Sequence, residues 1–277
     1  MNPTPDTAST QRAPIWPEAH VAPVGPGRFT GTIGEHWNAL QGLNGGMVAA
    51  HAVRAAEAVL ADLGVASDVH LRAATFGYVS GTVAGELDIE VEVVRQGRSL
   101  VTSHVRTVQQ GRTTMVGRLH HSAPWEGARY SDAPPMPARP DGTVPLTGNE
   151  RARHFDRVDT QLHPTTVPFG GGDRAEWLAW SRPGHGGHFD SAWLTMFGDY
   201  LPPAVFARST EPSRAVTIEY GIQIHQAAGA WSLADGERLT AHLHAAHSHD
   251  GFAVEDGWFY LPDGTVLATT RQTRLAG

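Results

Sequence analysis

The sequence predicts an α+β protein built from two similar units, in each of which an antiparallel sheet curls around one central helix. A Gly-Gly pair, an apolar helical segment and four strand-like runs occur twice, in the same order, along the 277 residues. Such repetition of one supersecondary plan is typical of a duplicated architecture. A Pro-rich stretch separates the two copies, and a chain of this length has room for two domains of ordinary size.

Composition divides the chain into four parts. Residues 1–27 are rich in Pro, Thr and Gly without periodic apolar positions, which predicts a flexible tail. Residues 28–122 form the first unit and residues 150–277 the second. Residues 123–149 contain frequent Pro, which blocks helical and sheet hydrogen bonds and favours an extended linker.

The first unit opens with a predicted strand at 28–34 and the sequence Leu43-Asn44-Gly45-Gly46. Residues 47–64 follow, an Ala-rich stretch without Pro whose apolar side chains cover most of the helix surface. A helix of this kind is normally enclosed by its own domain. Apolar residues alternate with acidic ones over 85–95, which indicates a sheet with one face in water. The four predicted strands are 68–79, 85–95, 99–109 and 112–121.

The second unit repeats this plan. Predicted strands at 154–162 and 174–181 precede Gly186-Gly187, and the stretch 190–200 has the apolar composition of a second buried helix. Turn residues divide the remainder into antiparallel hairpins. The final predicted strands are 214–226, 231–244, 249–260 and 265–275.

Composition also limits the function. The chain has no cysteine, which excludes disulfides, thiolate metal sites and a cysteine nucleophile. Its net charge is −7 and its basic residues are scattered, so we expect no nucleic-acid partner. No apolar run is long enough to span a membrane, and the first residues lack the pattern of a secretory signal. We therefore expect a soluble, cytoplasmic protein.

Three short motifs resemble a known family. LNGGM at Leu43–Met47 is followed at a family-like distance by VRQGRSL at Val94–Leu100, and DGTVLATTRQTRL at Asp263–Leu275 is similar to the family's closing strand. In this order the motifs resemble the acyl-CoA thioesterase II family of double-hotdog proteins, and the resemblance spans 28–277. It implies a double hotdog fold, an acyl-CoA or related thioester substrate and no cofactor.

The resemblance also implies a catalytic site. In the family a water held by an Asp, a Thr and a Gln attacks the thioester carbonyl, and the matching positions are Asp199, Thr217 and Gln272. Thioester hydrolysis needs a positioned water and donors aimed at the developing oxyanion, not a strong nucleophile. We expect Asn44 and Gly46 to bind substrate or oxyanion at the start of the first helix, with a backbone N–H at Gly187 as a second option.

Each of these residues also has a plain structural interpretation. Asp199 lies near a helix end, where the macrodipole disfavours a negative charge, and could be an exposed acid beside a turn. Thr217 has the strand parity opposite to its apolar neighbours and could face water. Gln272 could be a buried structural amide, and Asn44 and Gly46 suit a helix cap.

Other functions are also considered. Hydratase-type hotdog proteins use a D-x4-H pair, and no Asp in this chain has a His five residues later. A non-catalytic acyl-CoA or hydrophobic-ligand binding protein stays open, because fold does not fix function. His242 and His244 share a strand face, but their spacing fixes no third metal ligand, so we expect no metal. Pairing of sheet edges predicts a homo-oligomer.

Overall fold

The computed structural model describes residues 16–226 and 229–277. Its first unit consists of one long helix and the strands of a curved sheet. These elements are β1 (Val21–Gly25), β2 (Arg28–Ile33), β3 (Asn38–Ala39), β4 (Gly42–Leu43), α1 (Gly45–Asp62), β5 (His70–Tyr78), β6 (Gly85–Gln96), β7 (Leu100–Gln109) and β8 (Arg112–Ser122). The predicted helix and four-stranded meander are present, with ends shifted by two residues or fewer.

The second unit has the same meander but a much shorter central helix. Its elements are β9 (Val144–Pro145), β10 (Asp159–Leu162), β11 (Glu176–Arg182), β12 (His188–Asp190), α2 (Ser191–Phe197), α3 (Val205–Arg208), β13 (Ala215–Ile224), β14 (Ala230–Ser232), β15 (Leu239–His249), β16 (Phe252–Tyr260) and β17 (Val266–Ala276).

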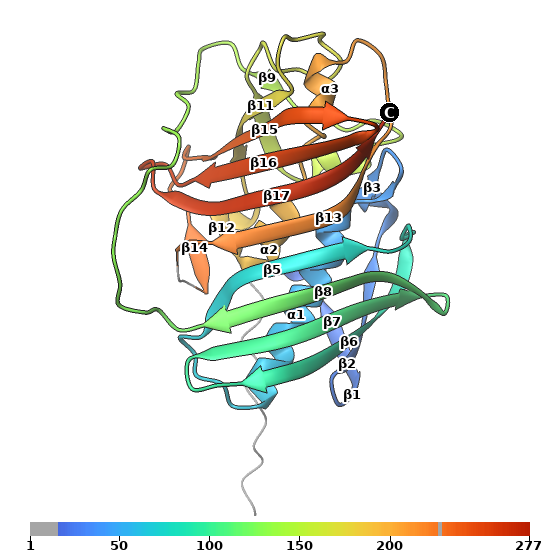
Figure 1. Cartoon of the computed structure of the whole chain (residues 1–277), viewed down its shortest axis with the longest axis vertical. Helices are drawn as coiled ribbons and strands as arrows, with labels where there is room; N and C mark the ends of the chain where they lie inside the picture. Colours follow the sequence, from blue (N-terminus) through green and yellow to red (C-terminus); the bar gives the residue numbers. More distant parts are fainter. Residues whose placement is uncertain (1–15, 227–228) are drawn as a thin grey trace, which may run out of the picture.

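The two predicted sheets are joined edge to edge. Within the described residues they form one 13-stranded antiparallel sheet in the order β1-β2-β6-β7-β8-β5-β13-β17-β16-β15-β11-β10-β9. The central pair is β5 and β13, where Phe76 lies opposite Tyr220 and their rings stack with centroids 5.9 Å apart. Figure 1 shows β5 and β13 side by side in the middle of the sheet, with α1 and α2 behind it.

The core lies between the sheet and the two helices. Small side chains on α1 allow a close approach to α2, and nearly every residue from Gly46 to Ala56 is buried. At the crossing, a Cβ on Gly46 would lie 2.4 Å from the carbonyl oxygen of Met196, so only glycine permits this packing. The crossing places the first residues of α1 beside the chain that leaves α2.

Several predicted elements are wrong in detail. The strand expected at 154–162 begins as a 3-10 helix, Arg153–Asp156, and only β10 is extended. The strand expected at 231–244 divides into β14 and β15. Gly186 and Gly187 have φ values of +71° and +83° and lie in a short 3-10 turn, His185–Gly187, that does not open α2, because β12 comes between and α2 begins at Ser191 with Asp190 as its N-cap.

The two Pro-rich stretches differ from each other. The predicted tail lies outside the described residues as far as residue 15, but β1 pairs with β2 at the sheet edge, so the chain is ordered from there. Pro23 is tolerated in β1 because an edge strand has one unpaired side. The stretch after β8 has no regular element before β9 and crosses the molecule as an extended connection (Figure 1).

No helix in the described part of the chain is long and apolar enough to cross a membrane.

Candidate active site

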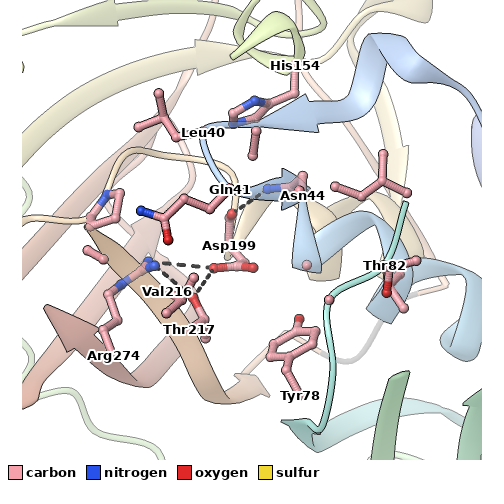
Figure 2. Close-up of a pocket in the computed structure, with 18 of the residues that line it drawn as sticks. Leu40, Gln41, Asn44, Tyr78, Thr82, His154, Asp199, Val216, Thr217 and Arg274 are labelled. Atoms are coloured by element: carbon pink, nitrogen blue, oxygen red, sulfur yellow. Dashed lines mark hydrogen bonds and ion pairs between the residues drawn. The ribbon is translucent and has the colours of Figure 1, made fainter. Parts of the chain in front are cut away.

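A cavity of about 350 Å³ lies where the two units meet. Its walls come from the residues preceding and opening α1, the end of β5, the chain after α2, and the first residues of β13. Figure 2 shows Asp199 near its centre, with Thr217 and Arg274 on one side and Tyr78 on another. The cavity therefore contains side chains from both units, and two of the three predicted catalytic residues line it directly.

Asp199 lies just after α2, with its carboxylate at the N-terminus of α1. The Asn44 amide donates to its backbone carbonyl over 2.8 Å, and the Gly46 N–H donates to its carboxylate. Asp199 lies past the C-terminus of α2 as expected, but the interpretation as an exposed acid is wrong, because Asp199 is buried and the positive end of the 18-residue α1 faces its charge. This environment stabilises an anion that would otherwise be costly to bury.

The pKa of Asp199 is raised to about 6. Burial is the main cause, because it disfavours the charged form. Arg274 opposes this shift, Glu255 adds to it, and the hydrogen bonds from Thr217 and Gly46 oppose it. A carboxylate with this pKa is ionised at neutral pH and basic enough to accept a proton from water.

Thr217 faces the cavity because of a β-bulge. Between Thr217 and Glu219 the pairing of β13 with β17 shifts by one residue, so Thr217 lies opposite Arg274 while Tyr220 lies opposite Gln272. The extra residue reverses the parity, and Thr217 shares the inner face with Tyr220. The interpretation that Thr217 faces water is therefore wrong, since strand parity read from the sequence cannot reveal a bulge.

Gln272 is buried in β17 next to Thr217. Its amide nitrogen donates to the Gly198 carbonyl over 3.0 Å, which turns its amide oxygen towards the Thr217 hydroxyl, also 3.0 Å away. The same hydroxyl is 3.2 Å from Oδ1 of Asp199. The structure thus brings Asp199, Thr217 and Gln272 into one hydrogen-bonded group (Figure 2 draws the Asp199–Thr217 bond).

Two charged residues of this group were not predicted as site residues. The Arg274 guanidinium donates to the Thr217 hydroxyl over 2.7 Å and to Glu255 over 2.9 Å, and lies 3.6 Å from Asp199. Glu255 also accepts from the Ala204 N–H. Arg274 carried a partial signal in the sequence, since it has the parity of Ala268, Thr270 and Gln272, whereas Glu255 has the parity opposite to Phe252, Val254 and Trp258 and its burial appears only in the structure. Tyr78, at the end of β5, was also missed.

The residues expected to bind the oxyanion have other partners. Oδ1 of Asn44 accepts from the Met47 N–H over 3.0 Å as the N-cap of α1. With its amide bonded to Asp199 and the Gly46 N–H bonded to the carboxylate, both residues position Asp199. The Gly187 N–H donates to Gly184 and opens no helix, so the suggested site at Gly187 is wrong.

Among the residues that the structure describes, the histidines of β15 belong to no metal site. His242 hydrogen-bonds Glu176 of β11 over 2.7 Å, a contact within the sheet. Over residues 16–226 and 229–277, no group of three or more His, Asp or Glu side chains is placed to hold a metal ion.

The fold and its cavity define a double-hotdog protein, as predicted. The family model for the acyl-CoA thioesterase N-terminal domain matches residues 33–121, and the model for the acyl-CoA thioesterase C-terminal domain matches residues 130–276. The chain therefore belongs to the acyl-CoA thioesterase family, and its resemblance to the type II members is confirmed. No curated protein matches the sequence.

Solved structures agree on the fold. A conserved protein of unknown function with a hot dog fold from Alicyclobacillus acidocaldarius is 19% identical, with a TM-score of 0.79 over 94% of this chain and 96% of that one. Acyl-CoA thioesterase II TesB2 from Mycobacterium marinum is 18% identical, with a TM-score of 0.73 over 95% and 98%. A tesB protein from Mycobacterium avium subspecies paratuberculosis is 15% identical, with a TM-score of 0.72 over 95% and 98%.

Proposed function

We propose that this chain hydrolyses acyl-CoA thioesters with a water molecule activated by Asp199 and oriented by Thr217 and Gln272. The observation that carries the proposal is the convergence of these three side chains beside a cavity shared by both units. Membership of the acyl-CoA thioesterase family supports a thioester as the substrate. No metal or redox group is needed, because a thioester is already activated for attack by water.

Asp199 is the proposed general base. Its pKa of about 6 makes it mainly a carboxylate at neutral pH, yet a stronger base than an exposed aspartate. The Gly46 N–H and the Asn44 amide fix its position from α1, while Arg274 balances part of its charge.

The Thr217 hydroxyl explains how a water would be oriented. Its oxygen accepts from Arg274, and its single proton can be donated to either Asp199 or Gln272 but not to both. When Thr217 donates to Gln272, the Asp199 carboxylate at the cavity is free to accept an O–H of water. This arrangement gives the water one direction for its proton and leaves a lone pair for attack.

The proposed reaction is balanced with these groups alone. Water attacks the thioester carbonyl carbon and forms a C–O bond while its proton passes to Asp199. Collapse of the tetrahedral intermediate breaks the C–S bond and releases the CoA thiolate. The proton on Asp199 then passes to that thiolate, which leaves a carboxylic acid, free CoA and the starting form of the enzyme.

The test is free-thiol release from short, medium and long acyl-CoAs by the wild type, Asp199→Asn and Glu219→Gln. Removal of the general base is expected to lower kcat by about 10² to 10⁴-fold. Glu219 lies on the same strand as Thr217 but is exposed, so its variant is the matched control and is expected to keep wild-type activity.

Each contrary outcome has a distinct meaning. If folded wild type releases no thiol from any acyl-CoA, the hydrolase proposal is wrong and the alternative of a ligand-binding hotdog protein replaces it. If the wild type is active and Asp199→Asn is equally active, the enzyme stands but Asp199 is not its base.

A further inference from the structure

Tyr78 presents a hydroxyl group without a hydrogen-bond partner beside the proposed catalytic carboxylate. The residue ends β5 of the first unit and lines the same cavity as Asp199. Its hydroxyl is sheltered from solvent and bonds to no atom in the described part of the chain. A buried, unpaired hydroxyl costs free energy, and such exceptions in a folded protein call for a functional explanation.

The surroundings of Gly45 show how close the two groups come. A Cβ on Gly45 would lie 2.8 Å from Oδ2 of Asp199 and 2.9 Å from the Tyr78 hydroxyl, so any side chain at this position would clash with both oxygen atoms. Gly45 has no positive φ, so backbone conformation does not require a glycine here. The missing side chain instead leaves room for the carboxylate and the hydroxyl on either side of the start of α1.

The other donors considered for the thioester carbonyl are occupied. The Asn44 amide donates to the Asp199 backbone, and the Gly46 N–H donates to the Asp199 carboxylate. The Tyr78 hydroxyl keeps its proton for a ligand. Figure 2 shows Tyr78 across the cavity from Arg274, with its hydroxyl pointing into the space beside Asp199.

We propose that the Tyr78 hydroxyl donates a hydrogen bond to the thioester carbonyl oxygen and stabilises the oxyanion formed when water attacks. This rests on the proposed thioesterase function. Water held on the Thr217 side of Asp199 would reach the carbonyl carbon from one direction, while Tyr78 meets the oxygen from the other. Donors fixed in advance at the site of developing charge are among the largest contributions to catalysis.

The electrostatic environment keeps this donor protonated. Burial raises the pKa of Tyr78 well above its usual value, and the neighbouring Asp199 charge raises it further. The hydroxyl therefore retains its proton over the whole range in which Asp199 titrates. No proton leaves Tyr78 in the proposed step, since it only shares its hydrogen with the oxyanion and keeps it when the C–S bond breaks.

The experiment compares Tyr78→Phe with Tyr220→Phe. Both changes remove only a hydroxyl, from a partly buried ring in Tyr78 and a fully buried ring in Tyr220, but the Tyr220 hydroxyl donates to the Thr195 carbonyl over 2.8 Å and does not line the cavity. Tyr78→Phe is expected to lower kcat by about 10² to 10³-fold with KM changed less than threefold and Tm unchanged or raised. Tyr220→Phe is expected to lower Tm and leave kcat within threefold.

The outcomes separate this proposal from the proposed function. Thiol release by the wild type, together with a kcat for Tyr78→Phe within threefold of it, would overturn the role of Tyr78 alone. A Tm loss in Tyr78→Phe as large as in Tyr220→Phe would show that the hydroxyl has a structural partner, which also overturns it. Absence of thiol release from the wild type would overturn both proposals.

Discussion

The two units contain the same structural frame, but only in one of them do the residues at its three positions form a hydrogen-bonded group. In the second unit a bulge follows Thr217 where β13 pairs with β17, and Thr217 lies opposite Arg274. In the first unit a bulge follows Leu71 where β5 pairs with β8, and Leu71 lies opposite His121. Counting from either bulge, Gln272 corresponds to Leu119. An equivalent backbone therefore holds Thr, Gln and Arg in one unit and Leu, Leu and His in the other.

The helix ends differ in the same way. The N-terminus of α1 receives the Asp199 carboxylate at the cavity, whereas Arg54 of α1 forms an ion pair with Asp190, the N-cap of α2. Next to this pair, Ser191 donates to Glu57 of α1. The α2 end thus has its N-cap in an ion pair beside a smaller cavity of about 250 Å³, while the α1 end has Asp199 beside the cavity of about 350 Å³.

The duplicated fold determines the backbone at these positions, but it does not determine which side chains occupy them. In both units the residue before the bulge points inward. Thr217 there forms hydrogen bonds, whereas Leu71 provides only an apolar side chain. His121 is buried with neither ring nitrogen paired among the described residues, and burial lowers its pKa to about 4. It is therefore neutral at neutral pH and cannot take the place of the Arg274 cation.

The largest expected effect is on the free energy of unfolding, when the buried charge network of Arg274, Asp199 and Glu255 is disrupted. Arg274→Met would leave the buried carboxylates of Asp199 and Glu255 without their cation, and removal of one partner from a buried charge network costs about 3 to 5 kcal/mol. Urea unfolding measures this loss. The control is Arg271→Met in the same strand, whose ion pair with Asp256 is exposed and contributes about 1 kcal/mol or less. Equal losses for the two variants would contradict the description of a buried network.

A smaller effect is expected from Thr217→Val, which keeps the shape and removes the hydroxyl. Arg274 and Gln272 would lose a shared partner, and the water would lose its fixed direction, so we expect kcat to fall by about 10 to 100-fold. Leu71→Val at the equivalent bulge is the control and is expected to cost about 1 kcal/mol of stability with kcat unchanged. Similar kcat losses in both variants would remove the functional distinction between the two units.

Much of the architecture could be predicted from the sequence because it rests on local patterns. The period-2 alternation over residues 85–95 and the apolar surface of 47–64 each gave an element with ends within two residues of those in the structure. The prediction failed at Gly186-Gly187. These glycines have positive φ values within a connecting segment and do not start an α-helix.

The site was only partly predictable, because its geometry depends on long-range contacts. The positions of Asp199, Thr217 and Gln272 came from family resemblance. Their convergence depends on the bulge after Thr217 and on the crossing of α1 over α2, neither of which leaves a local signal. Tyr78 was missed because a tyrosine at the end of a strand is ordinary in sequence, and only its place beside Gly45 distinguishes it.

The most direct test of the central claim, that Asp199 is the base of a thioester hydrolase, is the pH dependence of kcat/KM for an acyl-CoA that the wild type cleaves. Protonation of Asp199 would remove the base, so kcat/KM is expected to fall about tenfold per pH unit below a pKa near 6 and to level off above it. The residual rate of Asp199→Asn should lack this bend. A wild-type profile that is flat through this range, or the same bend in Asp199→Asn, would contradict the claim.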